Sequence, residues 1–228
     1  MESEKSMKVF VIGAAGRVGQ RLTVGLVASG HSVTGMHRNP EQRDIVERAG
    51  AVPTEADLIE SSISGITEKM SGHDAVVFCA GAHGTGRDLT TLIDGKGLEK
   101  SATAAALAGV PRFVLVSAFA DSERGKGLGD DFEHYIRVKR GAEIFLTQTD
   151  LDWLVVRPGH LLDGAGDGLI TAGLALRERD IRRENLASFI IAALENPNLS
   201  RTIVEVTDGR TPIPDAVAGV ASSVGPRR

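Results

Sequence analysis

Residues 8–20 read KVFVIGAAGRVGQ, and this stretch decides the fold. An apolar strand runs into Gly13, Gly16 and Gly19, and an amphipathic helix is expected to begin near Arg17. The first glycine permits a tight turn, the second lets phosphates approach backbone N–H groups, and the third lets helix and strand pack closely. The context of this G-x-x-G-x-x-G pattern predicts a dinucleotide site. The alternative is a strand-to-helix turn that needs glycine for packing alone.

The order of elements predicts an α/β fold. Strands and helices alternate from residue 8 to about 156, and three strands are continuous apolar runs, as in parallel strands covered on both faces. This alternation predicts a three-layer, doubly wound Rossmann fold with a parallel sheet. We expect strands at 8–12, 32–37, 51–53, 75–79, 112–117 and 153–156, and helices at 17–29, 40–49, 59–70, 89–108 and 130–147.

The pattern loosens after residue 158. Residues 159–173 carry five glycines and predict a mobile loop with one short strand, followed by a helix at 183–194, a strand at 202–206 and a helix at 213–221. We therefore expect a single NAD(P)-binding domain over residues 1–228. Its nucleotide-binding core spans 7–158, and 159–228 form a small substrate-side cap that is not an independent domain.

Composition narrows the class of partner. The chain has 228 residues, 42% hydrophobic and 25% charged, which is typical of a globular protein with a full core. A net charge of −4 gives no electrostatic footprint for nucleic acid or an anionic membrane. The single cysteine, Cys79, forms no intramolecular disulfide, and the polar N-terminus lacks a signal-peptide pattern. We expect a cytoplasmic monomer or homodimer that acts on a small molecule.

The end of the second strand bears on the choice of nucleotide. Proteins that prefer NAD place a carboxylate there for the ribose 2′-OH, but residues 35–39 read GMHRN. Arg38, aided by Arg17, is expected to clamp a 2′-phosphate, which favours NADP(H) over NAD(H). The alternative for Arg38 is a solvated arginine at a strand end.

Two further segments are expected along the nucleotide. Asp57 and Leu58 follow the third strand and would lie near the adenine. Ala80, Gly81 and Ala82 follow the fourth strand and offer a small-residue path beside the nicotinamide ribose.

The chemistry is expected from Tyr135 and Lys139. Four residues apart on a helix, their side chains share one face, and the ammonium favours the phenolate. The tyrosine is then a usable general acid for a carbonyl that accepts hydride. Ser117 ends a strand and is expected to hold that carbonyl, with Ser122 as a less favoured substitute. The alternatives are a packed tyrosine with a solvated lysine, and a serine that only forms a turn.

Weaker candidates are three histidines: His83 and His160 beside the nicotinamide or substrate, and His134 as another proton donor. No residue group has metal-ligand spacing, and no G-x-S-x-G elbow is present. We therefore expect no metal and no hydrolase chemistry.

The segments GAAGRVG, FVLVSAFA, YxxxK and LVVRPGHL together resemble the atypical short-chain dehydrogenase/reductase superfamily. The nearest branch is that of small NAD(P)-binding, epimerase-like proteins with NmrA-like and biliverdin-reductase-B-like members, and the resemblance spans residues 7–222. The long, charged segment 120–131 departs from the pattern and bears on the alignment of serine and tyrosine. The resemblance implies a cofactor loop at Gly13, Gly16, Arg17, Val18 and Gly19, 2′-phosphate contacts at Arg17 and Arg38, an adenine contact at Asp57, a catalytic triplet of Ser117, Tyr135 and Lys139, and a nicotinamide contact at Pro158, Gly159 and Leu161.

These observations predict an NADP(H)-dependent oxidoreductase that transfers hydride to a small carbonyl, quinone or flavin-like acceptor. Two alternatives stay open. One is a non-catalytic redox sensor, which needs the glycine loop and Arg38 but not Tyr135. The other is a sugar-nucleotide epimerase or dehydratase, although the chain after Pro158 is short for the larger substrate domain of such enzymes.

Overall fold

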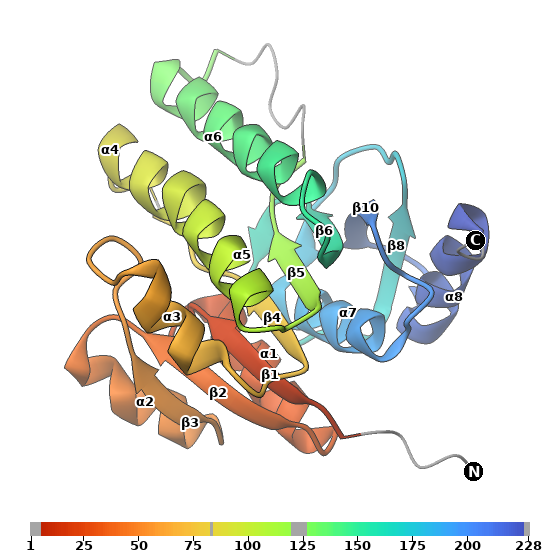
Figure 1. The fold of residues 1–228 in the computed structure, drawn as a ribbon. Coiled ribbons are helices and arrows are strands. Elements are labelled where there is room, and N and C mark those ends of the chain that lie inside the picture. Colours follow the sequence, from red (N-terminus) through yellow and green to blue (C-terminus); the bar gives the residue numbers. More distant parts are fainter. Residues whose placement is uncertain (1–5, 83, 120–126, 226–228) are drawn as a thin grey trace.

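The computed structural model describes residues 6–82, 84–119 and 127–225, which form an α/β fold around one large sheet (Figure 1). The sheet has nine strands in the order β11-β8-β10-β6-β5-β4-β1-β2-β3. Strands β1 to β6 and β10 run parallel, and β8 is antiparallel to both β10 and β11. A second, parallel pair joins β7 to β9. The strands are β1 (Lys8–Ile12), β2 (Ser32–His37), β3 (Val52–Glu55), β4 (Ala75–Phe78), β5 (Arg112–Val116), β6 (Asp152–Pro158), β7 (Leu161–Leu162), β8 (Leu169–Gly173), β9 (Ile181–Arg182), β10 (Thr202–Asp208) and β11 (Thr211–Pro212).

Helices cover both faces of the sheet (Figure 1). Successive residues of β1 point to opposite faces, so Val9 and Val11 join one core while Phe10 and Ile12 join the other. The first core packs under α1 (Arg17–Ala28), α2 (Arg43–Arg48), α7 (Arg183–Glu195) and α8 (Ile213–Val224), and the second under α3 (Ile63–Met70), α5 (Leu98–Leu107) and α6 (Asp130–Thr147).

Within the described ranges, no helix has the length and hydrophobicity needed to span a membrane.

The turn between β1 and α1 needs glycine for conformation and for space. Gly13 has a φ of +85°, and a Cβ there would lie 2.7 Å from the backbone nitrogen of Ala80. A Cβ on Gly19 would lie 2.2 Å from the carbonyl oxygen of Gly13. The turn is therefore pressed against both the end of β4 and its own helix, as the glycine spacing predicts.

Several expected elements differ from the structure in extent. The helix expected at 59–70 begins at Ile63, because Ser62 caps it and Asp57 closes the preceding turn. The helix expected at 89–108 is instead α4 (Arg87–Thr90), a π-helical segment (Thr91–Gly97) and α5. The antiparallel strand β8 makes the sheet mixed rather than wholly parallel.

Residues after β6 contribute to the sheet itself. Strand β10 pairs with β6, and β8 and β11 extend the same edge. The segment expected as a loop with one strand holds β7 and β8, and between them Asn185 of α7 accepts the N–H of Gly168 and donates to Asp167. The C-terminal residues thus extend the sheet and also cover it.

Gly19→Ala is expected to destabilise the protein by about 2 kcal/mol or more, because the added methyl group overlaps backbone atoms that cannot move independently. Gly219→Ala in α8 is the matched control: its Cβ meets nothing within 4 Å, and alanine favours the helix by up to about 1 kcal/mol. Urea unfolding of both variants measures the difference. Equal stabilities would contradict the packing role of Gly19.

Candidate dinucleotide and active site

Two adjoining cavities lie at the carboxyl ends of the parallel strands, where ligands bind in open α/β sheets. The smaller has a volume of about 280 Å³ and the larger about 520 Å³. Their shared lining of small residues marks the boundary between them and consists of Gly16, Cys79, Ala80, Gly81 and Ala82.

The smaller cavity is lined by residues from the ends of β1 and β2 and from the turn after β3. Gly13, Arg38, Asp57 and Leu58 all line it. Asp57 Oδ1 accepts the N–H of Ile59 at 2.6 Å, which orders this turn. The backbone N–H of Arg38 donates to Gln42, while no ion pair of its side chain is found among the described residues. The only acidic residue of the described chain that lines this cavity is Asp57.

The larger cavity contains the three residues expected to carry chemistry. Ser117, Tyr135 and Lys139 all line it, together with Val18 and Leu161. Ser117 directly follows β5 and is 5% exposed, and its Oγ has no hydrogen-bond partner among the described residues. A buried hydroxyl without a partner costs free energy, and this one belongs to a residue in the wall of the cavity.

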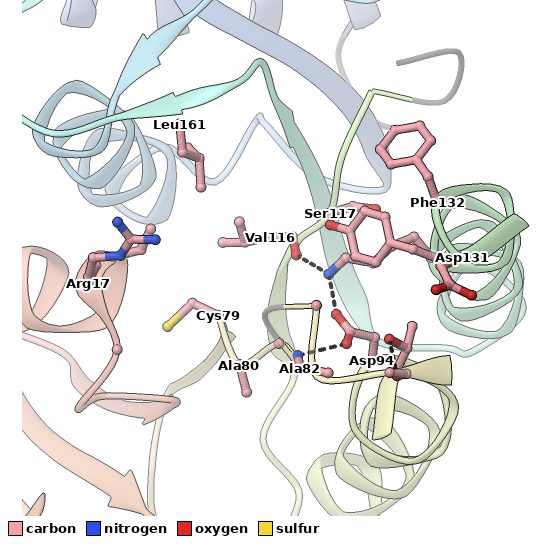
Figure 2. A pocket seen from close by; sticks show the side chains of 18 of the residues that line it. Arg17, Cys79, Ala80, Ala82, Asp94, Val116, Ser117, Asp131, Phe132 and Leu161 are labelled. Carbon is pink, nitrogen blue, oxygen red and sulfur yellow. Dashed lines mark hydrogen bonds and ion pairs between the residues drawn. The ribbon is translucent and has the colours of Figure 1, made fainter. Parts of the chain in front are cut away.

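Lys139 is buried and paired with an acid that sequence reasoning missed. Its Nζ lies 3.1 Å from Asp94 Oδ1, donates to the carbonyl oxygen of Val116 at 3.2 Å, and lies 5.9 Å from the centre of the Tyr135 ring (Figure 2). Burial by itself lowers the pKa of Lys139, but its electrostatic interactions with Tyr135, Asp94 and Glu143 and its hydrogen bond with Asp94 raise the pKa, which lies above its usual value. The lysine therefore stays charged.

Asp94 also shapes the wall of the cavity. It is 2% exposed, and its Oδ2 accepts the backbone N–H of Ala82 at 3.0 Å. The wider π-helical turn brings this carboxylate inward, and such turns often occur at functional sites. The only signal in the sequence was a pair of glycines, Gly95 and Gly97, in the middle of an expected helix.

The structure separates the two arginines that were expected to act together. Arg38 lines the smaller cavity, whereas Arg17 lines the larger one and contacts Asp163 at 3.2 Å. Because the two side chains line different cavities, they are not placed to bind one phosphate together. Of the two arginines, only Arg38 lines the smaller cavity, which Asp57 also lines.

Other expected residues lie outside the cavities. Gly19 packs against Gly13, and Pro158 and Gly159 are not among the residues that line either cavity. A Cβ on Gly159 would overlap the carbonyl oxygen of Arg179, so this glycine serves backbone packing.

Of the histidine candidates, neither His134 nor His160 lines a cavity. His134 Nε2 is engaged with Thr91 at 2.9 Å, and the exposed His160 is absent from both cavity linings. His83 and Ser122 lie outside the described residues. In the ranges that the structure describes, no three His, Cys, Asp or Glu residues are grouped to hold a metal.

Cys79 lies on the boundary between the cavities. Burial raises the pKa of its thiol to about 12, although Lys139 and a backbone hydrogen bond lower it. Its Sγ donates to the carbonyl oxygen of Ile12 at 3.1 Å. At neutral pH the side chain is a protonated thiol, which is a poor nucleophile.

The residues present fit a bound dinucleotide. The N-terminus of α1 leaves backbone N–H groups without helical partners beside the glycine turn, and a pyrophosphate accepts such bonds. Side chains larger than hydrogen at Gly13 would collide with the end of β4. One cavity on each side of this helix start accommodates one half of the molecule. These are the features of a Rossmann-type dinucleotide-binding protein.

A model of the NAD(P)H-binding family matches residues 13–197, and the chain belongs to this family. The protein "Uncharacterized sugar epimerase YhfK" of Bacillus subtilis (strain 168) is 38% identical over 214 residues, which cover 92% of this chain and 99% of its own. The family confirms the resemblance to atypical short-chain dehydrogenases/reductases.

Solved structures agree on the architecture. A "Putative NAD-dependent epimerase/dehydratase" from Bacillus halodurans has a TM-score of 0.86 and 32% identity, covering 94% of this chain and all 100% of its own. ChuY, an "Anaerobillin Reductase" from Escherichia coli O157:H7, has a TM-score of 0.73 at 21% identity, covers 88% of this chain and 97% of its own, and shows a shared fold.

Asp94→Asn is expected to cost about 3–5 kcal/mol of stability, because it leaves the buried ammonium of Lys139 without its counter-charge. Urea unfolding at neutral pH measures the loss. The matched control is Asp88→Asn, which makes the same change at an exposed aspartate in the preceding helix α4 and should change the stability by less than about 1 kcal/mol. A similarly small effect at Asp94 would refute the structural role of the ion pair.

Proposed function

We propose that this protein is an NADP(H)-dependent oxidoreductase that transfers hydride to a small carbonyl, quinone or flavin-like acceptor. The observation that carries the proposal is the unpartnered, buried hydroxyl of Ser117 in the same cavity as Tyr135 and Lys139. Three other buried polar atoms of the described residues lack partners, on Thr23, Trp153 and Ser200, but among these four residues only Ser117 lines a cavity, and it does so beside a potential proton donor. The membership of the NAD(P)H-binding family supports the cofactor class.

The choice of NADP(H) over NAD(H) rests on the smaller cavity. Arg38 lies at its rim after β2, where an NAD site would carry a carboxylate for the ribose 2′-OH. A guanidinium there is suited to a 2′-phosphate through paired, charge-assisted hydrogen bonds. One oxygen of Asp57 is used by the turn, which leaves the other for the adenine amine.

The reduced nicotinamide would supply a hydride to the acceptor carbon. Ser117 Oγ donates a hydrogen bond to the acceptor oxygen and fixes its position. Tyr135 Oη gives its proton to that oxygen as negative charge develops on it, so a carbonyl gains one hydride and one proton. Lys139 stabilises the resulting phenolate with its charge.

Lys139 has a further use in this arrangement. An ammonium has three donors, and those to Asp94 and Val116 account for two. The third donor is available to the nicotinamide ribose. Asp94 and Val116 thereby act as positioning groups, because they fix the direction of the remaining N–H.

The alternative of a redox sensor keeps the same nucleotide site but needs no proton donor. The names of YhfK and the Bacillus halodurans protein refer to epimerases, and an epimerase would use Tyr135 as well. The low net charge and the single cysteine support a cytoplasmic protein with a small-molecule substrate. We propose a monomer or homodimer.

NADPH should bind at least about tenfold more tightly than NADH, and Arg38→Ala should remove this preference, because it deletes the charge-assisted bonds to the 2′-phosphate. Fluorescence titration with both nucleotides measures it. Arg48→Ala, another exposed arginine outside both cavities, is the control and should keep the preference. Equal affinity of the native protein for both nucleotides would rule out the NADP assignment.

Tyr135→Phe should lower the rate of NADPH oxidation by about a hundredfold or more while the NADPH affinity stays unchanged, because only the proton donor is lost. Menadione, nitrobenzaldehyde and riboflavin phosphate serve as acceptors. Ser117→Ala should lower kcat as well and should not weaken nucleotide binding. Tight NADPH binding with no turnover of any acceptor by the native protein would favour the sensor.

A further inference from the structure

Three arginines from two helices converge on one carboxylate at the larger cavity. Arg17 and Arg21 lie one turn apart on α1 and contact Asp163 at 3.2 and 3.3 Å. Arg183, the first residue of α7, contacts the same carboxylate at 3.0 Å. Asp163 follows β7 and is 55% exposed at its side chain, and of the three guanidinium groups that it holds together Arg17 is the most exposed and Arg183 is buried.

This cluster carries more positive than negative charge. Three guanidinium groups share one carboxylate, so two positive charges are left over. Arg183 is only 6% exposed. Its pKa is lowered by burial and by the charges of Arg17 and Arg21, although Asp163 raises it. A second anion beside this cluster would therefore be strongly stabilised.

Neighbouring acids do not supply that anion. The Glu184 carboxylate accepts the N–H of Gly166 at 2.8 Å. The carboxylate of Asp167 pairs with Arg182 at 2.6 Å. Each of these acids has its own partner.

The excess charge faces the proposed chemistry across a single cavity. Arg17 and Arg183 line the same cavity as Ser117 and Tyr135. Figure 2 shows Arg17 on the opposite side from Ser117 and Phe132, with Leu161 between the two sides above the opening. One side of the cavity thus carries Arg17 and Arg183 with their excess positive charge, and the other carries the two hydroxyl groups beside the charge-balanced pairs Lys139–Asp94 and Arg87–Asp131.

We propose that the acceptor carries a carboxylate or phosphate group, which binds to Arg17 and Arg183 at the cavity wall, beside the charge of Arg21, while its reducible group lies between Ser117 and Tyr135. This inference rests on the proposed function and specifies its substrate class. The pyrophosphate of the dinucleotide has the same chemistry, and the experiment below separates the two sources of the anion.

The test compares two probes of one shape: isophthalate, a dianion, and isophthalamide, its neutral counterpart. Isothermal titration calorimetry measures the binding of each probe, both to the NADPH-saturated and to the nucleotide-free protein, and measures NADPH itself. The variants are Arg183→Gln and the more exposed Arg21→Gln, which remains informative if the buried substitution prevents folding. Arg48→Gln removes one exposed positive charge far from Asp163 in the sequence and is the control.

We expect the NADPH-saturated protein to prefer isophthalate by about tenfold or more, from charge-assisted hydrogen bonds. The preference should fall to about twofold or less in Arg183→Gln or Arg21→Gln and persist in Arg48→Gln, with NADPH affinity unchanged in all three.

Two results would overturn the proposal while leaving the proposed function intact: no discrimination between the probes by the native protein, or a loss of NADPH affinity in both cluster variants without a change in probe preference. The second result would assign the cluster to the pyrophosphate. Failure to bind NADPH, with the preference for isophthalate kept in the nucleotide-free protein, would instead refute the proposed function and support the anion site.

Discussion

The buried ion pair of Asp94 and Lys139 is the interaction on which the rest of the site depends. Neither charge is tolerated alone in a protein interior, so the elements that carry them must come together. The pair joins the π-helical segment to α6, and its remaining hydrogen bonds reach the end of β5 and the N–H of Ala82. Tyr135, one turn before Lys139, and the boundary between the cavities are positioned as a consequence.

The site draws on both faces of the sheet, and each face supplies a different chemistry. Helix α1 and the start of α7 contribute N–H groups and arginine side chains. Helix α6 and the π-helical segment contribute the phenol, the ammonium and its counter-ion. The small residues after β4 lie between them and leave an open path from one cavity to the other. Such a division suits a dinucleotide and an acceptor, because each of these ligands has a charged part and a part that reacts.

Local sequence patterns predicted the helices and strands but did not predict contacts between residues that are far apart in the sequence. The bounds of β1, β2 and α6 agree with the hydrophobic runs, because these patterns depend on neighbours in the sequence. Strand ends and helical spacing also singled out Ser117, Tyr135 and Lys139, and the structure places all three in the wall of one cavity. The π-helical segment was missed, since one extra residue in a turn barely disturbs a helical pattern. The contacts of Asp163 with Arg17 and Arg21 join residues more than a hundred positions apart, which no local spacing encodes.

The two outer strands of the sheet are short and each contains a proline. Strand β3 has four residues with Pro53 in its interior, and β11 is the pair Thr211–Pro212. Proline has no N–H to offer an incoming strand, and short edges give little length for pairing. Both margins are thus poor templates for edge-to-edge growth, which protects a nine-stranded sheet from polymerising into fibrils.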